Sequence, residues 1–299
     1  MRLISALAFA LTVAACGDGS SDTASSGEGG SSGASTGAFN TGSGSGQNED
    51  GCVDAARSVY VIGKGRELVR FDPEAMTFDQ VGEIACPVNG GPAVGVPTPF
   101  SMAVDRGGTA WVLYSDGTMY AVDVTDGSCK MTGFMPNQLE AFELFGMGFV
   151  TDTKDSSTET LYVSSYSPGD GIGDLSLSDL AIRRVGFYHG LSGAAELTGT
   201  GDARLYGFFA SNPPRVARID KTDASILQTV DLPDTQIGAG WAFAFWGDGF
   251  WMFTAPDGGN SRLDRLDATT LTLEAERDDI GLQVVGAGVS TCAPVAAPK

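Results

Sequence analysis

The chain carries five copies of one pattern, large-small-large-small-large, and the partner of the last copy lies at the opposite end of the sequence. The five copies span residues 100–104, 145–149, 197–201, 241–245 and 285–289, the third in degenerate form. A second segment with an aromatic residue follows each of the first four copies, as expected of consecutive strands in one repeat. The fifth copy has no room for such a segment, and residues 58–62 match it instead. The two ends of the repeat region are therefore expected to meet.

The aromatic residues of the second segments set the length of the repeat. They are Tyr60, Trp111, Tyr162, Tyr206 and Trp251, at spacings of 51, 51, 44 and 45 residues. These spacings agree with the roughly 40 to 50 residues of a four-stranded propeller blade. We predict an all-β fold, a five-bladed β-propeller of four-stranded blades closed by pairing of the N- and C-terminal strands. A β-sandwich also has short, regular strands, but it gives no reason for a repeat divided between the termini.

Local features of the repeat agree with such a ring. The innermost strands of a propeller converge on its axis, and small residues such as Gly146 and Ala242 relieve the crowding while large ones point to the other face. The expected third strands end next to an aspartate, which accepts backbone N–H groups in the following turn. These aspartates are Asp72, Asp123, Asp179, Asp220 and Asp267.

The first residues predict export. A short basic start precedes an apolar run from Leu3 to Ala15. Such a run would cover about 20 Å as a helix, less than the roughly 30 Å of a bilayer core, so residues 1–15 are expected to be a signal peptide. The ending Val13-Ala14-Ala15-Cys16 resembles the lipobox of bacterial lipoproteins, which implies cleavage before Cys16 and lipid attachment to its sulfur. An ordinary secretory signal is the alternative.

Residues 16–51 are expected to form a disordered tether that begins at the lipidated Cys16. They consist mostly of Gly, Ser, Thr and Ala, which bury too little apolar surface to fold. Residues 52–299 are then the propeller domain. The formal net charge of −19 would repel nucleic acids, so we expect no nucleic-acid partner. We also expect a monomer that meets the membrane through its N-terminal lipid.

Four cysteines remain for the exported domain, and they allow three pairings. Cys52 and Cys292 flank the two strands that must pair, so a disulfide between them would hold the ring closed. Cys86 and Cys129 are then left to join outer strands of neighbouring repeats. A zinc site is the alternative, but the sequence contains no Cys-x-x-Cys spacing to support it.

Several segments together resemble those of uncharacterised secreted propeller lipoproteins that are abundant in myxobacteria. The segments are residues 99–105, 145–149, 196–201, 241–246 and 285–292. The resemblance covers most of the chain beyond the tether. It implies a location in the bacterial cell envelope, as a lipoprotein anchored in the outer membrane and facing the periplasm or the cell surface. It implies no activity.

Candidate site residues come from aligning the inner segments. The alignment places Glu196 at one end of the central channel. It places four residues at the other end: Asp105, Asp202, Trp246 and Ser290. Carboxylates at a channel mouth can hold a cation or a polar ligand, although turn residues of a propeller are often aspartates as well. A divalent cation there is a hypothesis, and no other cofactor is expected.

Two further motifs have simpler explanations. His189 lies near Ser192, but the Gly-x-Ser-x-Gly elbow of a serine hydrolase is missing, so His189 is expected to be a loop residue. Residues 169–174 place carboxylates among glycines and resemble a calcium loop only in part, because they lack the EF-hand ligand order. We interpret them as a turn-rich insertion between strands.

The sequence therefore favours a non-catalytic binding or adhesion module for a protein or glycan ligand. The lipid anchor, the tether and the lack of a catalytic set support this reading. The alternative is a periplasmic lactonase-like hydrolase or lyase with a metal at the channel mouth. It depends only on the carboxylates of that mouth, and fold analogy is weak support for chemistry.

Overall fold

The computed structural model describes residues 48, 50–88, 95–154 and 156–298. All of them lie within the compact unit Ser45–Lys299. The expected signal peptide, Cys16 and most of the expected tether lie outside the described residues. Within the described ranges, no helix is long and apolar enough to cross a membrane.

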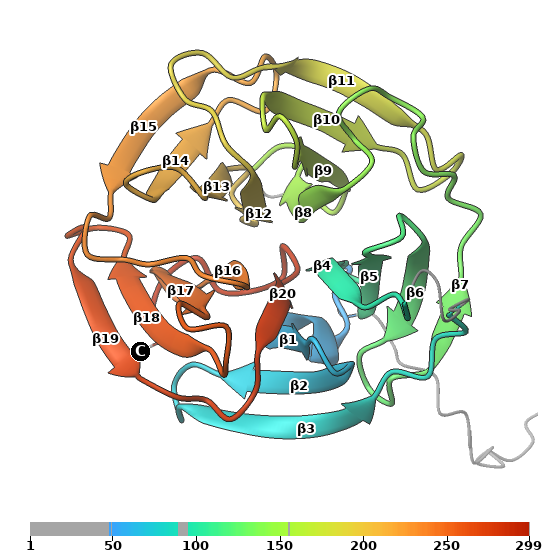
Figure 1. Cartoon of the computed structure of the whole chain (residues 1–299), viewed down its shortest axis with the longest axis horizontal. Coiled ribbons are helices and arrows are strands. Elements are labelled where there is room, and N and C mark those ends of the chain that lie inside the picture. Colours follow the sequence, from blue (N-terminus) through green and yellow to red (C-terminus); the bar gives the residue numbers. More distant parts are fainter. Residues whose placement is uncertain (1–47, 49, 89–94, 155, 299) are drawn as a thin grey trace, which may run out of the picture. The chain divides into compact units, whose positions relative to one another are not determined.

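The described residues form five antiparallel sheets of four strands each, arranged as blades around a central axis (Figure 1). Blade 1 consists of β20 (Val284–Gly288), β1 (Val59–Gly63), β2 (Glu67–Asp72) and β3 (Thr77–Glu83). Blade 2 consists of β4 (Pro99–Val104), β5 (Thr109–Tyr114), β6 (Met119–Asp123) and β7 (Cys129–Met131). Blade 3 consists of β8 (Phe145–Thr151), β9 (Glu159–Ser165), β10 (Gly171–Leu175) and β11 (Ile182–Phe187). Blade 4 consists of β12 (Ala195–Gly199), β13 (Leu205–Phe209), β14 (Arg215–Ile219) and β15 (Ile226–Asp231). Blade 5 consists of β16 (Trp241–Trp246), β17 (Gly249–Thr254), β18 (Arg262–Asp267) and β19 (Leu273–Arg277).

The ring closes through blade 1, as the sequence predicts. The C-terminal strand β20 pairs with β1, with Tyr60 opposite Gly288 and Val61 opposite Ala287. Figure 1 shows β20, in red, beside the blue β1. The predicted five-bladed propeller is therefore confirmed, and the aromatic residues that set its period all lie in the second strand of their blades.

Two disulfides join the cysteine pairs expected from the sequence. Cys52 is bonded to Cys292, 240 residues away, next to the strands that close the ring. Cys86 is bonded to Cys129 and links blade 1 to blade 2. Disulfides persist in oxidising compartments, so they indicate an extracytoplasmic location.

The turn aspartates have the expected structural role. Oδ1 of Asp72 accepts hydrogen bonds from the backbone N–H groups of Glu74 and Ala75 at 2.9 and 3.0 Å. Asp123, Asp179, Asp220 and Asp267 accept backbone N–H groups in the same way. These carboxylates therefore fix turns between the third and fourth strands.

The interpretation of residues 169–174 as an insertion between strands is wrong. Gly171–Leu175 is β10, the third strand of blade 3, with Asp174 opposite Tyr162 of β9. The sequence does not predict this strand because glycine is depleted in strands and common in turns. Here a Cβ on Gly171 would overlap the carbonyl oxygen of Gly186 in β11, so the sheet itself requires glycine at this position.

The core consists of one apolar cluster in each seam, the interface between the faces of two neighbouring blades. Phe145 and Phe149 of β8 are fully buried between blades 2 and 3. On the other face of β8, a Cβ on Gly146 would overlap the carbonyl oxygen of Ala195 in β12. The alternating pattern therefore has the expected role. Large residues fill the seam on one face of the inner strand, and small residues allow the inner strand of the next blade to approach closely on the other face.

Candidate functional site

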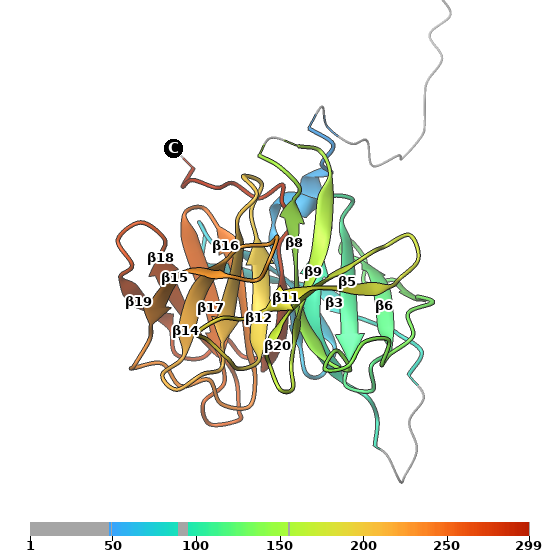
Figure 2. The ribbon, with the colours of Figure 1, turned by 90° about the horizontal axis from the view of Figure 1, so that it is seen from above.

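The first strand of each blade, β20, β4, β8, β12 or β16, lines the central channel. We call the side of the ring at which these inner strands begin the start face, and the side at which they end the end face. The 3-10 helix η1 (Asp54–Arg57) lies at the end face (Figure 2). Polar side chains from several blades gather at each face, and they make different contacts at the two faces.

The predicted aspartates of the end face hold local structure. Oδ1 of Asp105 accepts the backbone N–H of Thr109 at 2.9 Å, and Oδ2 accepts the indole N–H of Trp111 at 2.9 Å. Asp202 is paired with Arg204, whose Nε lies 2.8 Å from Oδ1. This pairing lowers the pKa of Asp202 against the opposing effect of its partial burial. Both carboxylates therefore have protein partners.

Trp246 and Ser290, the other two predicted residues, hold η1 in place. The indole N–H of Trp246 donates to the carbonyl oxygen of Arg57 at 3.1 Å. Oγ of Ser290 donates to the carbonyl oxygen of Ala56 at 2.6 Å. The structure thus brings all four predicted residues to the end face and uses each in a structural contact. No three His, Cys, Asp or Glu side chains of the described chain come close enough to hold a metal ion.

Sequence reasoning missed a partly buried carboxyl group at the end face. Oε1 of Glu159 accepts the backbone N–H of Arg106 at 2.8 Å, and Oε2 accepts the hydroxyl of Thr291 at 2.6 Å. Burial raises the pKa of Glu159 to about 7, although both hydrogen bonds favour the ionised form. Its side chain joins blade 3 to the loops after β4 and β20. Glu159 opens a second strand, where the repeat pattern gave no signal.

The start face holds Glu196, as expected from the alignment. Its side chain is only 4% exposed. Oε2 accepts a hydrogen bond from Oγ of Ser101, across the channel in β4, at 2.7 Å. Burial raises the pKa of Glu196 well above its usual value and outweighs the hydrogen bond from Ser101, which favours the ionised form.

A cavity of about 170 Å³ opens above Glu196, and we call it the channel mouth. Each blade contributes one of its lining residues: Val285, Phe100, Tyr166, Glu196 and Trp241. The ring of Tyr166 packs edge-on against Phe100 at 5.1 Å and stacks with Trp241 at 6.1 Å. The mouth therefore combines an aromatic wall with a buried carboxyl group at its base.

One polar group of the channel mouth lacks a partner. The indole N–H of Trp241 is buried and makes no hydrogen bond to any part of the chain that the structure describes. Buried polar groups in folded proteins nearly always have a partner. Lys64, exposed at the rim, is the one basic residue among those that line the cavity. The mouth thus offers an unpartnered N–H donor near a buried carboxyl group.

Sequence analysis placed Glu196 but did not identify the aromatic wall. Phe100 and Trp241 are the first large residues of two copies of the repeat, which suggested core packing. Their position at the edge of the start face could have distinguished them from Met102 or Phe243, which are fully or almost fully buried. Tyr166 follows β9 outside the pattern and gave no signal.

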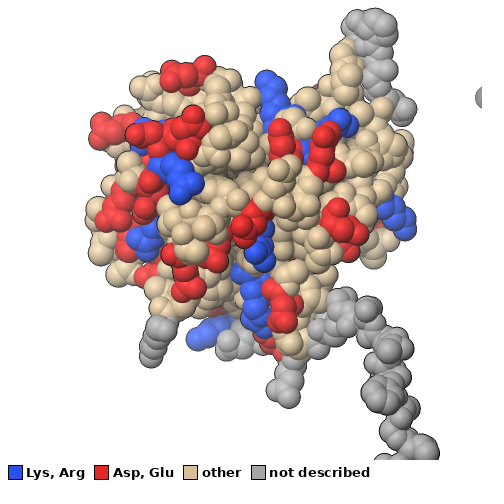
Figure 3. Space-filling view, turned by 90° about the horizontal axis from the view of Figure 1, so that it is seen from below, with Lys and Arg blue, Asp and Glu red and all other residues tan. Residues whose placement is uncertain are grey.

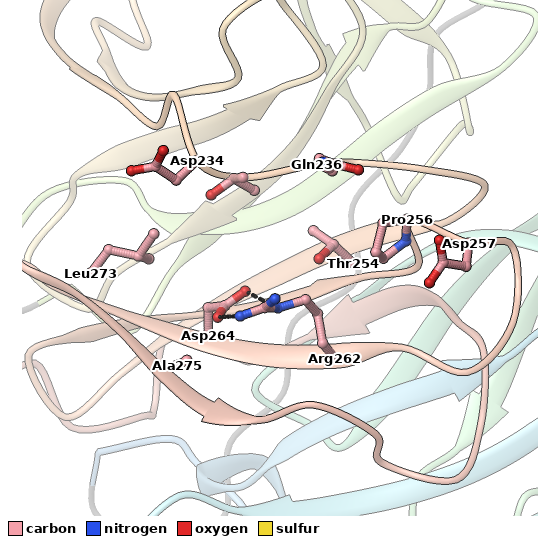
Figure 4. A pocket seen from close by; sticks show the side chains of 10 residues that line it. Asp234, Gln236, Thr254, Pro256, Asp257, Arg262, Asp264, Leu273 and Ala275 are labelled. Carbon is pink, nitrogen blue, oxygen red and sulfur yellow. Dashed lines mark hydrogen bonds and ion pairs between the residues drawn. The ribbon is translucent and has the colours of Figure 1, made fainter.

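A larger pocket of about 430 Å³ lies on the start-face side of the seam between blades 4 and 5, and we call it the seam pocket (Figure 4). Its floor holds a two-bond ion pair in which Nε and one terminal nitrogen of Arg262 lie 2.9 and 2.6 Å from the carboxylate oxygens of Asp264. The side chain of Asp264 is only 5% exposed. Thr235 and Thr254 also line the pocket. The repeat pattern did not point to this site.

The two remaining motifs do not form a site. His189 is exposed in the loop between β11 and β12. Asp170 accepts a hydrogen bond from Ser165 at 3.0 Å, and Asp174 lies 3.8 Å from Arg183. These carboxylates therefore have local partners within blade 3.

No protein-family model and no curated protein matches the chain. Among solved structures, TolB from Acinetobacter baumannii is 15% identical with a TM-score of 0.41, over 74% of this chain and 52% of TolB, so the chain spans about half of that protein. A catalytically inactive virginiamycin B lyase from Staphylococcus aureus, crystallised with Quinupristin, is 14% identical with a TM-score of 0.42, over 81% of this chain and 73% of the lyase. A protein of unknown function from Bacteroides caccae is 9% identical with a TM-score of 0.42, over 77% of this chain and 97% of that one. At such low identities and TM-scores, no residue role is transferred.

Proposed function

We propose that this protein is a non-catalytic, extracytoplasmic binding module that holds a protein or glycan ligand at the channel mouth. The observation that carries the proposal is the convergence of one residue from each blade on a cavity with an aromatic wall and a buried acid. Concave sites with apolar walls and a few oriented polar groups are typical of ligand binding. The end face supports the same choice, because its predicted candidates already have protein partners.

The chemistry of the mouth favours a glycan over a charged peptide segment. The rings of Tyr166 and Trp241 offer flat apolar surfaces on which the C–H face of a sugar can pack. The buried carboxyl group of Glu196 and the free indole N–H of Trp241 can hydrogen-bond the hydroxyl groups of a sugar. The raised pKa of Glu196 shows that burial disfavours charge at the base of the cavity, so a charged side chain would be destabilised there as well.

We further propose that the module is a lipoprotein of the bacterial outer membrane, tethered through lipid on Cys16 and facing the periplasm or the cell surface. The lipobox-like ending and the Gly- and Ser-rich segment of the sequence support the tether. The two disulfides agree with an extracytoplasmic location. Fatty-acid labelling tests the anchor: label that depends on Cys16 supports it, and equal label on Cys16→Ser contradicts it.

The hydrolase or lyase alternative has no observation in its favour. It needs carboxylates that converge on a cation, and the described part of the chain holds no cluster of three metal-binding side chains. The binding module is therefore the only function we propose.

A binding screen with matched variants tests the proposal. The full chain is screened against a glycan array and against envelope proteins, and the best ligand is then titrated against Tyr166→Ala and Phe187→Ala. Both residues are exposed aromatics of blade 3, at 38% and 51%, but only Tyr166 lines the mouth. We expect Tyr166→Ala to weaken binding about tenfold or more and Phe187→Ala to leave it unchanged. Equal affinities for the two variants would overturn the site.

A further inference from the structure

The seam pocket lies where blade 5 departs from blades 2 and 4 in one register. In each blade, one residue of the second strand pairs with the first residue of the inner strand. In the five blades these residues are Gly63, Tyr114, Ser165, Phe209 and Thr254. Tyr114 and Phe209 are fully buried rings that fill the seams in front of blades 2 and 4. Thr254 is smaller than these rings, as are Gly63 and Ser165, so its side chain does not fill the equivalent space in front of blade 5.

Asp264 is the second departure. It lies opposite Met252 in β18, and the residues in the same register of the other blades are Val69, Tyr120, Gly173 and Ala217. None of these carries a charge at neutral pH. Burying the carboxylate of Asp264 costs desolvation energy that its ion pair with the partly exposed Arg262 does no more than offset, and apolar residues often stabilise such a position as well. Stability of the seam therefore does not explain this carboxylate.

Two hydroxyl groups of the seam pocket are left without partners. Oγ1 of Thr235 and Oγ1 of Thr254 are buried and make no hydrogen bond to any described residue. Thr254 is fully buried and Thr235 is 8% exposed. Figure 4 shows Thr254 in the pocket above the ion pair of Arg262 and Asp264. Buried hydroxyls of this kind are satisfied when a ligand with hydrogen-bonding groups enters the cavity.

The charge of the pocket selects the type of ligand. Asp234 and Asp257 line it from two different loops and are exposed. Within the described residues neither forms an ion pair, whereas Asp264 is neutralised by Arg262. The pocket therefore carries two uncompensated carboxylates. Figure 3 shows Lys and Arg side chains among the acidic ones on one side of the ring, and the net charge of −19 makes the field of the protein as a whole attractive to cations.

We propose that the seam pocket binds a small aliphatic amine. Asp234 and Asp257 hold its ammonium groups, whose N–H groups also donate hydrogen bonds to the free hydroxyl groups of Thr235 and Thr254. The pocket volume of about 430 Å³ suits a small organic molecule better than a bare ion. A metal ion is disfavoured because no three metal-binding side chains of the described chain cluster there. The proposal does not depend on a ligand at the channel mouth.

Calorimetry on the full chain tests this proposal with a matched pair of probes, putrescine and 1,4-butanediol. The two molecules have the same four-carbon chain, but only putrescine carries ammonium groups. We expect putrescine to bind, more weakly as salt rises, and butanediol to give no binding heat. Equal binding of both probes, or no binding of putrescine and spermidine, would overturn the proposal.

Three variants locate the binding. Asp257→Asn removes one exposed carboxylate and should weaken putrescine binding by about tenfold. Glu276→Gln makes the same charge change on β19, at an exposed residue that does not line the pocket, and should have no effect. Thr254→Tyr places in blade 5 the ring that blade 2 carries and should abolish binding. Residue 254 is buried, so the tyrosine can prevent folding. In that case Asp257→Asn still tests the proposal.

The source of the amine is a separate arm of the test. If a lysine-containing peptide binds and the free diamine does not, the pocket receives a side chain of a partner protein and the small-amine proposal fails. The mouth variant Tyr166→Ala should bind putrescine as the native chain does. If the screen finds no ligand for the channel mouth, the putrescine measurement therefore still tests the seam pocket.

Discussion

The two ends of the channel use their polar groups in different ways. At the end face, Trp246 and Ser290 hold η1, and Glu159 bonds Thr291 and the backbone of Arg106. At the start face, an indole N–H stays unpartnered among the described residues, beside a buried acid. The end face is thus committed to holding the closed ring, whereas the start face keeps groups available for a ligand.

The largest expected effect tests the closure of the ring. Replacing Cys52 and Cys292 by serine removes a crosslink across 240 residues, which the chain-entropy model values at about 5 kcal/mol. The matched control replaces Cys86 and Cys129, which are 43 residues apart and should cost about 4 kcal/mol in the same model. Urea unfolding measures both losses. A smaller loss for the first pair than for the second would contradict the role given to the end face.

Glu159→Gln tests the partly buried acid of the end face through pH. The raised pKa means that the folded state holds a proton between about pH 4.5 and 7 that the unfolded state has lost. Between these pH values the unfolding free energy of the native chain should therefore fall by up to about 3 kcal/mol relative to that of Glu159→Gln. Above pH 7 the difference between the two proteins should stay constant. The amide keeps a hydrogen-bond acceptor for Arg106. Parallel stability profiles of the two proteins would show that Glu159 is not buried as described.

Gly146→Ala tests how closely the inner strands approach at the start face. The added Cβ would overlap the carbonyl oxygen of Ala195, so we expect a loss of about 1 to 3 kcal/mol. Gly259→Ala is the control, because nothing lies within 4 Å of its added Cβ. Thermal unfolding compares the two. A loss no greater for Gly146→Ala than for the control would mean that the strands are further apart than the structure shows.

Glu196→Gln should give the smallest effect, below about 1 kcal/mol at pH 4, because both side chains are then uncharged and of similar shape. The raised pKa of Glu196 predicts that the native chain loses stability relative to the amide as pH rises above 4.5. Unfolding at several pH values checks this trend. An amide variant that is less stable at every pH would instead indicate an ionised carboxylate at the base of the mouth.

The sequence was sufficient for the ring and for part of the site. Periodicity and the split fifth repeat predicted the blades, the closure and the cysteine pairing, because these depend on strand order alone. Glu196 could be placed because it occupies a known register of an inner strand. The wall of the mouth could not be predicted, since Tyr166 in the loop after β9 meets Trp241 at the start of β16 only in the folded ring.

The seam pocket illustrates a second limit. Asp264 looks ordinary in a strand, and its meaning appears only when it is compared with the residues in the same register of the other blades. The sequence does not give that register, because the glycines of β10 in blade 3 resemble a turn. Once the pairing is known, departures from the repeat are the clearest signal of function in this chain.

The two tryptophans of β16 offer the most direct test of the account, since Trp241 lies at the start face and Trp246 at the end face of the same strand. The affinity for the ligand found in the screen is measured for Trp241→Ala and for Trp246→Ala. We expect a loss of about tenfold or more for Trp241→Ala and an affinity within about threefold of the native chain for Trp246→Ala. Unchanged binding in Trp241→Ala, or a greater loss in Trp246→Ala, would contradict the assignment of the ligand to the channel mouth.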